Sequence, residues 1–253
     1  MISKAYGKKS FLAMAAMVLA TVSTQGLAQN AKPDTSGASS ASATSMKAQP
    51  STAESRPYIA SDTMQQVTEA AEVVRRMEAD PEIKKLLQQA KGVFIVPTYG
   101  RGGWGIGIRG GEGVMLANNN GTWSSPVFYN IGGVSVGLQA GAEVGSIAML
   151  LMNEKAVNEF MKENNFSVGI GTGLTLVNYT AKAQANAGRG DVIVWADTKG
   201  AFANATVGIS DIHFDDNDNR AFYKSEVAAK DIISGKMKSN QAAALTKELS
   251  SGN

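Results

Sequence analysis

Apolar residues between positions 61 and 90 recur every three or four residues, which is the spacing of amphipathic helices. Ser61 and Asp62 form a good N-cap pair, so we expect the first helix to begin there. Asp80 followed by Pro81 predicts the end of this helix and the start of a second, with Asp as the cap and Pro in the first turn. The apolar stripes comprise Met64, Val67, Ala71, Val74 and Met77 in the first helix, and Ile83, Leu86, Leu87 and Ala90 in the second.

From Gly92 onward the apolar period changes to two, which is typical of strands. Residues 93–96 are uniformly apolar, which predicts a strand buried on both faces. Between 103 and 108, glycines alternate with Trp and Ile, so one face of that strand is bulky and the other is bare. The sequence Asn-Asn-Asn-Gly at 118–121, between two apolar segments, predicts a hairpin turn with positive φ angles.

A second glycine series occupies positions 133, 137, 141 and 145. Even spacing places all four on one face of a strand, where missing side chains permit tight curvature or close approach of the backbone. The alternative is a small-residue seam between packed helices. Val134 and Val136 favour a strand through about position 141, whereas residues 147–152 fit either structure.

Short strands and helices are expected in the remaining sequence. Asn153 predicts the cap of a helix at 154–164. Strands are expected at 166–170, 174–179, 192–196, 201–207 and 209–214, and helical segments at 219–224, 227–233 and 241–249. This order predicts an α+β domain at 61–250, with a mostly antiparallel, curled, glycine-rich β-sheet flanked by N- and C-terminal helices.

The first 28 residues have the organisation of a secretory signal peptide, with a basic start, an apolar run at 11–22 and small residues before Ala28. The apolar run is shorter than the roughly 20 residues of a membrane-spanning helix, although a retained membrane anchor is the alternative. Residues 29–60 are rich in Ser, Ala and Thr and have few apolar side chains to bury, so we expect a flexible tether. These features predict export to a bacterial periplasm.

Composition narrows the possible functions. The chain has no cysteine, which excludes disulfides, thiolate catalysis and thiolate metal sites. Three of the 24 Lys and Arg residues lie in the predicted leader, which has no acidic residue, so 21 remain against 22 Asp and Glu. This balance disfavours a broad surface for nucleic acid, and no nucleic-acid partner is expected. Any attraction to anionic lipid must come from a local patch.

Taken in order, these segments resemble the SYLF domain family. Residues 90–93 before an apolar strand resemble the opening of that domain, 137–143 and 153–160 its middle, and 219–223 and 231–235 its end. The resemblance covers about residues 61–249. It implies a lipid-binding, non-catalytic domain without a cofactor. Eukaryotic members of the family are linked to phosphoinositides and to actin, and bacterial members are exported proteins.

The chain departs from the family pattern in two places. Eukaryotic members use a basic amphipathic N-terminal segment on membranes, whereas a signal peptide and a neutral tether occupy that position here. Many relatives carry an Asp near Ser146. Because a periplasm contains no actin, actin is not expected as a partner. The expected partners are an anionic phospholipid or membrane surface, or a protein of the envelope.

Basic side chains on the predicted helices and the glycine-rich strand are the candidate lipid contacts, because cations beside apolar stripes can meet lipid phosphates. The alternative is an ordinary solvated face, since several glutamates share the same helices. The candidates are Arg75, Arg76, Lys84, Lys85 and Lys91 on the helices, and Arg101 and Arg109 near Trp104.

The densest group of oxygen ligands follows the last predicted strand. Asp215, Asn217, Asn219 and Glu226 fall at positions one, three, five and twelve of a calcium-binding EF-hand loop. Arg220 stands where the sharp turn of that loop requires Gly. The preferred interpretation is therefore a turn in which Asp218 or Asn219 caps a helix, with a calcium site as the alternative.

No catalytic residue is predicted. Residues 105–110 have the glycine spacing of a dinucleotide-binding motif, but they alternate like a strand and no helix follows. His213 is the only histidine, and Ser210 and Asp211 lie too close to it in sequence to assemble a triad. The leading hypothesis is a binding domain for phospholipid or another anionic amphiphile. The alternative is a structural or protein-interaction module of the periplasm, and a hydrolase would need a nucleophile that the sequence lacks.

Overall fold

The computed structural model describes residues 56–163, 165–168, 173–179, 190–200 and 211–251. The predicted signal peptide, most of the predicted tether and the predicted strand at 201–207 lie outside these residues. The helices are α1 (Arg56–Glu78), α2 (Pro81–Gln89), α3 (Glu154–Phe160), α4 (Asp216–Tyr223), α5 (Ala229–Ile233), the 3₁₀ helix η2 (Asn240–Ala242) and α6 (Ala243–Ser251). The strands are β1 (Gly92–Asn119), β2 (Thr122–Trp123), β3 (Val127–Leu151), β4 (Leu176–Asn178), β5 (Val192–Gly200) and β6 (Ile212–Phe214).

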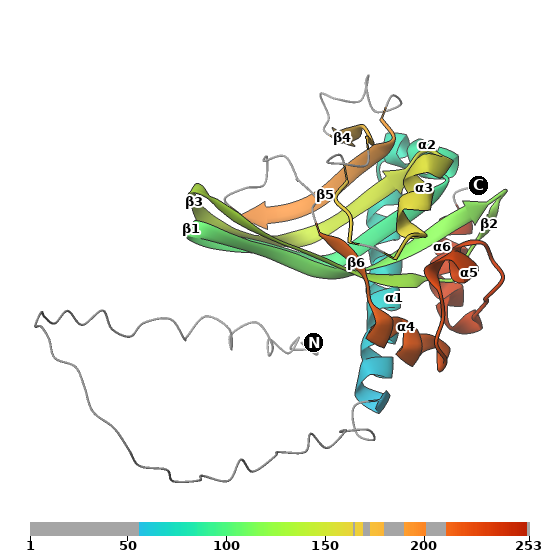
Figure 1. The fold of residues 1–253 in the computed structure, drawn as a ribbon. Coiled ribbons are helices and arrows are strands. Elements are labelled where there is room, and N and C mark those ends of the chain that lie inside the picture. The colour runs from blue at the N-terminus through green and yellow to red at the C-terminus, as the bar shows by residue number, and fades with distance from the viewer. Residues whose placement is uncertain (1–55, 164, 169–172, 180–189, 201–210, 252–253) are drawn as a thin grey trace, which may run out of the picture. The chain divides into compact units, whose positions relative to one another are not determined.

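The strands form one sheet in the order β2-β1-β3-β5-β4, with β6 also paired to β3 (Figure 1). All described pairs are antiparallel except β4 with β5. Helices precede and follow the sheet in the chain, so the predicted α+β class is confirmed. No helix among the described residues is both long and apolar enough to cross a membrane.

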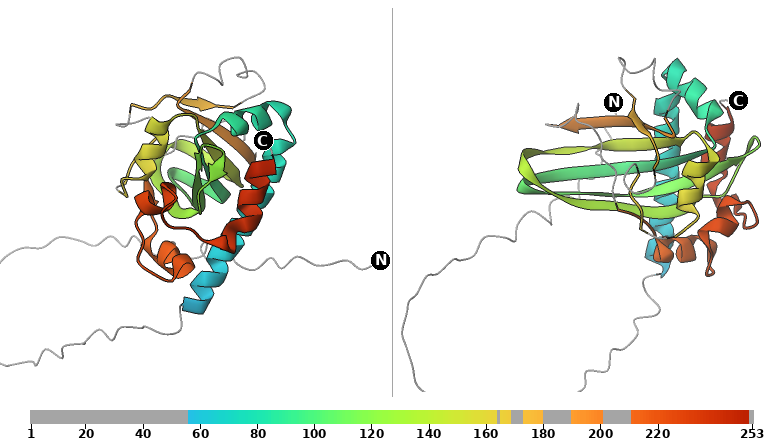
Figure 2. Two further views of the ribbon diagram at one scale, coloured as in Figure 1. Left: turned by 90° about the vertical axis from the view of Figure 1, so that its right-hand side faces the viewer. Right: turned by 45° about the horizontal axis from the view of Figure 1, so that its top comes forward.

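The long strands β1 and β3 form a hairpin that curls back on itself. They pair from Gly92 with Leu151 to Met115 with Val127, with register shifts near residues 97 and 105. Both strands turn back at their shared tip (Figure 2). The backbone at Gly113 consequently comes so close to an earlier part of β1 that a Cβ atom there would lie 2.7 Å from the Ile95 carbonyl oxygen. The prediction of a curled, glycine-rich sheet is confirmed.

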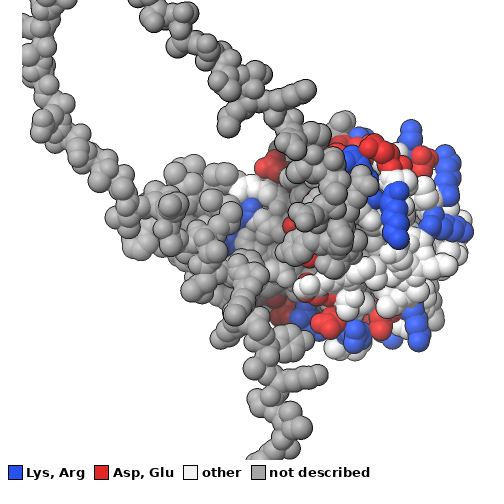
Figure 3. Space-filling view, turned by 90° about the horizontal axis from the view of Figure 1, so that it is seen from below, with Lys and Arg blue, Asp and Glu red and all other residues white. Residues whose placement is uncertain are grey.

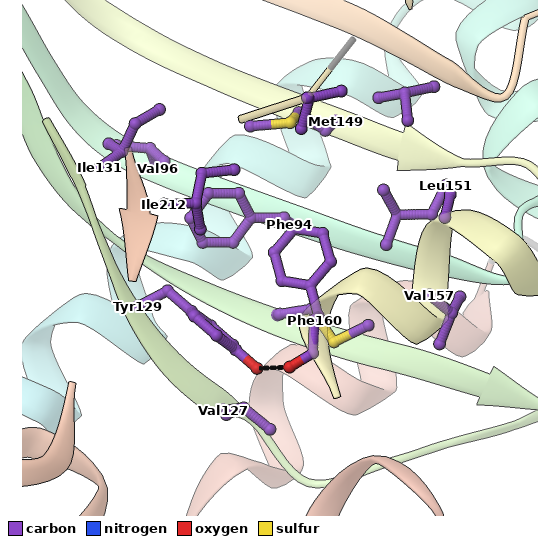
Figure 4. Close-up of a cluster of buried hydrophobic side chains, with 14 of the residues drawn as sticks. Phe94, Val96, Val127, Tyr129, Ile131, Met149, Leu151, Val157, Phe160 and Ile212 are labelled. Carbon is purple, nitrogen blue, oxygen red and sulfur yellow. Dashed lines mark hydrogen bonds between the residues drawn. The ribbon is translucent and has the colours of Figure 1, made fainter. Parts of the chain in front are cut away.

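Both faces of the central strands are buried, as the apolar run at 93–96 predicts. Phe94 and Val96 belong to an inner cluster, which the curled sheet encloses with α3 and α5. Val93 and Ile95 belong to an outer cluster, which α1, α2 and α6 cover. The inner cluster is filled by side chains, since the rings of Phe94, Tyr129 and Phe160 lie against one another (Figure 4). The Tyr129 hydroxyl donates a hydrogen bond to the Phe160 carbonyl oxygen.

Several predicted element boundaries agree with the structure. Asp80 caps α2 and accepts hydrogen bonds from the amides of Glu82 (2.9 Å) and Ile83 (3.4 Å). Asn153 caps α3 and accepts from the Ala156 amide at 3.0 Å. The predicted hairpin turn is also confirmed, with φ angles of 54° and 91° at residues 120 and 121. Residues 105–110 lie within β1, as the strand interpretation of their glycines requires.

The predicted start of the first helix needs correction. α1 begins at Arg56, so Ser61 and Asp62 lie inside the helix and do not cap it. Residues 56–60, which include Tyr58 and Ile59, were counted with the tether, but the long helix extends through them. The strand preferred for the glycine series is confirmed, and the alternative of a small-residue helix seam is excluded, because residues 133–145 form part of β3.

Candidate functional site

A polar groove of about 710 Å³ lies between the β1–β2 turn and the C-terminal helices. Its walls come from two distant parts of the chain, the hairpin at 119–125 and the segment 234–250. The lining residues are mostly small and hydroxyl- or amide-bearing: Asn119, Gly121, Thr122, Trp123, Ser124, Ser125, Ser234, Gly235, Lys238, Ser239, Asn240, Ala243, Thr246, Lys247 and Ser250.

Hydrogen bonds across the groove hold its two walls together. The Asn119 side chain donates to the Ile233 carbonyl oxygen at 2.9 Å, and the Trp123 indole donates to the Leu249 carbonyl oxygen at 3.1 Å. The Ser239 amide donates to the Ser125 hydroxyl oxygen at 2.8 Å. These three contacts connect the hairpin to α5, η2 and α6, so the groove is largely formed before any ligand arrives.

The groove carries positive charge and no acidic side chain. Lys238 and Lys247 line it and are exposed, while none of its lining residues is Asp or Glu. Neither lysine forms an ion pair with another residue that the structure describes. At the right of Figure 3, Lys and Arg side chains, with Asp and Glu beside some of them, stand around an uncharged surface. Ammonium groups beside hydroxyls and amides suit an anionic, hydrogen-bonding ligand.

Three of the five predicted basic contacts on α1 and α2 are paired with acidic side chains. Arg75 lies 3.6 Å from Glu248, and Lys85 lies 2.8 Å from Glu82. Arg76 forms an ion pair and a hydrogen bond, described below. Lys84 is half-buried and Lys91 is exposed. The pairs agree with the alternative of a solvated, charge-balanced face.

Arg76 connects α1 to the sheet through Ser146. Its guanidinium donates to the Ser146 hydroxyl oxygen at 2.7 Å and lies 3.8 Å from an Asp197 carboxylate oxygen. The Ser146 hydroxyl in turn donates to the Pro97 carbonyl oxygen at 2.7 Å. The position at which many relatives carry an Asp is therefore buried and in contact with an arginine.

The two arginines predicted near Trp104 lie on β1 and are both half-buried. In the β1–β3 ladder, Arg101 is paired with Glu143 and Arg109 with Gly133. Arg101 lies before and Arg109 after the register shift between Trp104 and Ile106.

The Asp/Asn group after β6 is a helix start. Asp215 caps α4, and its carboxylate accepts hydrogen bonds from the amides of Asn217 (3.0 Å) and Asp218 (2.9 Å). The capping interpretation is thus confirmed in kind, but the cap is Asp215, and neither Asp218 nor Asn219 has that role. The earlier residue caps because the helix begins at Asp216, three positions before the start predicted at 219.

The other members of the predicted calcium loop have separate roles. Asn219 is buried, and its side chain accepts from the Phe128 amide (3.1 Å) and donates to the Phe128 carbonyl oxygen (2.8 Å). Glu226 lies 3.1 Å from Arg220. The four proposed ligands are therefore not gathered around one point, and no group of three or more acidic or histidine side chains in the described residues is arranged to hold a metal ion.

His213 lies on β6 and is half-buried. Its Nδ1 atom is 3.2 Å from the Asp211 carbonyl oxygen, a contact within the same short segment. This local contact gives no sign of the activated nucleophile that the hydrolase hypothesis requires.

Two groups of polar residues were missed in the sequence. The groove lysines, Lys238 and Lys247, are nine residues apart, and only the return of the chain against the hairpin brings them to one groove. The second group surrounds Gln66 on α1, whose amide nitrogen donates to Glu112 and to Asp218, both at 3.0 Å. No sequence signal indicates this contact, because its members are 46 and 152 residues apart.

The fold and the groove define an α+β domain that presents a polar, basic surface at its C-terminal end. Residues 132–251 match the profile of the Ysc84 family, which is described as Las17-binding protein actin regulator. Residues 132–251 are therefore similar to a Ysc84 domain, the SYLF domain of the sequence analysis, and this match confirms the predicted resemblance to the family.

Proteins of yeast and mammals are similar to this chain. Protein YSC84 of Saccharomyces cerevisiae is 31% identical over 164 residues, which cover 62% of this chain and 35% of that protein. LAS seventeen-binding protein 3 of the same species is 30% identical over 159 residues, 60% of this chain and 34% of that protein. SH3 domain-containing YSC84-like protein 1 of Bos taurus is 27% identical over 154 residues, 59% of this chain and 45% of that protein. The matches thus span less than half the length of these relatives.

These names correct one expectation about partners. Actin was not expected, because the predicted signal peptide places the chain in a compartment without it. The family description and the names of relatives refer to Las17 binding and to actin regulation, so the exclusion of actin-related partners is wrong. The exclusion followed from the predicted location and not from any feature of the domain itself.

Proposed function

We propose that this chain is a non-catalytic binding module for a phospholipid or another anionic amphiphile, acting in the bacterial envelope after export. The observation that carries the proposal is the groove, in which two exposed lysines without ion-pair partners in the described structure stand among hydroxyl and amide groups. A lipid phosphate would interact with the ammonium groups of Lys238 and Lys247, and the Ser, Thr and Asn side chains would hydrogen-bond to the remaining headgroup oxygens.

Vesicle co-sedimentation with a Lys238→Gln/Lys247→Gln double variant tests this proposal. Each cation near an anionic membrane contributes about 1 kcal/mol, so the loss of two should weaken binding to phosphatidylglycerol-containing vesicles by about 30-fold at low salt. The charge-matched control is Lys155→Gln/Lys162→Gln, which alters two lysines outside the groove and should bind like the unmodified protein. Lys84→Gln/Lys85→Gln tests the basic surface that the sequence predicted.

Comparison of these variants shows whether the groove or the basic surface of α2 binds the vesicles. Loss of binding only in the groove variant supports the groove as the lipid site. Loss only in the Lys84/Lys85 variant would transfer the site to α2. Absence of binding by the unmodified protein at low salt would overturn the lipid proposal.

A second candidate function is protein binding without lipid, which the names of the relatives favour. In this alternative the domain engages a partner related to those of the actin-regulating relatives, or a protein of the envelope. Purified domain would then be retained by filamentous actin or by an immobilised envelope-protein fraction in lipid-free buffer. The lipid function predicts no such retention, whereas native mass spectrometry would find phospholipid co-purifying with the domain.

A further inference from the structure

Acidic side chains from three elements meet at the first half of α1. Gln66 on α1 is only 8% exposed, and its Nε2 atom donates to Glu112 Oε2 on β1 and to Asp218 Oδ2 on α4, each at 3.0 Å. Asp62, one turn earlier on α1, and Asp215, the cap of α4, also act electrostatically on these carboxylates. The group of Asp62, Gln66, Glu112, Asp215 and Asp218 is called the carboxylate–amide cluster below.

The cluster has more acceptors than donors. Gln66 uses its Nε2 group for two carboxylates, while its own Oε1 atom is buried without a hydrogen-bond partner among the described residues. A buried polar atom without a partner costs stability. A proton added to one carboxyl would supply the missing O–H donor and remove one negative charge.

Among the described residues, no basic group acts on the pKa of Glu112 or Asp218. Burial, together with Asp215 and Asp62, raises the pKa of Glu112. Burial and the neighbouring Asp215, Glu112 and Asp62 carboxylates raise the pKa of Asp218 from 3.8 to about 6, against a lowering by the Gln66 hydrogen bond. In the described part of the chain, the charged groups that shift the pKa of these two residues are therefore acidic.

The elements packed against the cluster have their basic groups elsewhere. On β3, the neighbour of Asp215 is Asn130, whose neutral amide donates to the Asp215 carboxylate. On α4, Arg220 pairs with Glu226, and on α1 Arg75 pairs with Glu248 of α6. On β1, Arg109 is three positions before Glu112, an odd separation that places the two side chains on opposite faces of a regular strand.

We propose that the carboxylate–amide cluster is a proton-responsive latch that fastens the first half of α1 to β1 and α4 in acid and loosens at neutral to alkaline pH. The latch joins segments that are far apart in sequence, since Gln66 bridges residues 112 and 218. Next to it, Val67 is 2% exposed and belongs to the outer apolar cluster. Opening of the latch therefore uncovers apolar surface beneath the start of α1.

The direction of the pH effect follows from linkage. A carboxyl whose pKa is raised in the folded protein binds its proton more tightly there than in the unfolded chain. Protonation consequently favours the folded, latched form. The stabilisation develops as pH falls through about 6 and is complete near the ordinary Asp value of about 4. At pH 8 the Asp218 carboxyl is ionised and the latch is weakest.

Hydrogen exchange measured by mass spectrometry on the full chain tests this proposal. Amides of residues 62–68, corrected for intrinsic exchange, should exchange about tenfold faster at pH 8 than at pH 5, since partial solvent exposure reduces the effect that the full pKa shift would allow. Asp218→Asn imitates the protonated carboxyl and should remove most of this difference by protecting α1 at pH 8. Glu112→Gln should reduce the difference to a smaller extent.

Controls distinguish the latch from a general charge effect. Asp216→Asn removes an exposed Asp from the same helix outside the cluster and should keep the full pH difference. The proposal is overturned if Asp218→Asn exchanges at 62–68 as the unmodified protein does at both pH values. It is also overturned if millimolar CaCl₂ protects these amides at pH 8 in the unmodified protein but not in Asp218→Asn, since the cluster would then respond to a divalent cation.

Discussion

At the scale of single residues, the curl of the sheet depends on positions where a side chain has no room. A Cβ atom on Gly113 would lie 2.7 Å from both the Ile95 carbonyl oxygen and the Phe94 ring. Gly113→Ala should therefore lower the free energy of unfolding by about 1–3 kcal/mol, because backbone and a packed ring must shift. Urea denaturation followed by circular dichroism measures the change.

Gly100 is the matched control for this substitution. It lies on the same strand, and a Cβ atom there would meet nothing within 4 Å. Gly100→Ala should leave the unfolding midpoint nearly unchanged. Equal losses in the two variants would show that backbone preference, rather than close approach, decides the cost.

The sequence shows where glycines are concentrated, but it does not show at which of them a side chain would prevent the sheet from curling. The alternation at 103–108 and the four-residue series at 133–145 are visible in the sequence and do lie in long strands. The close approach at Gly113 has no sequence pattern, because it depends on the turn of β1 onto itself. Contacts between distant residues, such as Gln66 with Asp218, are hidden for the same reason.

At the scale of elements, one buried side chain of α4 makes two hydrogen bonds to β3. Asn219 satisfies both the amide and the carbonyl of Phe128. Asn219→Ala would leave the buried Phe128 amide without this acceptor, while the Phe128 carbonyl oxygen would keep its hydrogen bond from the Asp215 amide at 3.1 Å. We therefore expect a loss of about 1–3 kcal/mol in the free energy of unfolding. Asn217→Ala, on the exposed side of the same helix, should cost less than about 0.5 kcal/mol.

Chemical denaturation of the two asparagine variants provides the measurement. A loss of less than about 1 kcal/mol in Asn219→Ala would mean that water replaces the amide. The comparison also bears on the predicted calcium loop, because a residue occupied by the backbone of β3 is unavailable as a metal ligand. The sequence singled out Asn219, but local spacing could not distinguish a metal ligand from a side chain that joins two elements by hydrogen bonds.

The sequence predicted the start of a helix correctly where the capping side chain accepts hydrogen bonds from amides only two or three residues away. Asp80 and Asn153 bond to amides two or three residues later, so the sequence contains both partners. The start of α1 was misplaced because tertiary packing supports the long helix, which extends five residues before the expected cap. The groove lysines were missed because no sequence motif surrounds either of them. Only the folded chain, in which the hairpin lies beside α6, brings them into one groove.

At the scale of the whole molecule, β1, β3 and β5 are shared by the inner and outer clusters. Alternate side chains of the same strands, such as Phe94 and Ile95, belong to opposite clusters, so neither cluster can lose its packing without disturbing the backbone of the other. The described domain should therefore unfold in a single cooperative transition. Trp123 belongs to the outer cluster and Trp195 packs against it, so tryptophan fluorescence measured with Trp104 replaced by Phe reports that cluster. The inner cluster is probed by substitution.

Two cavity-forming variants, one in each cluster, test this cooperativity. Val74→Ala removes packing beneath α1, and Phe160→Leu removes an aromatic ring from the inner cluster. Each should lower the free energy of unfolding by about 1–3 kcal/mol. In both variants, Trp fluorescence and far-ultraviolet circular dichroism should give the same urea midpoint. If Phe160→Leu shifted the circular dichroism midpoint but not the Trp fluorescence midpoint, the clusters would be separate folding units, and the shared strands would not couple the surface at α1 to the interior of the sheet.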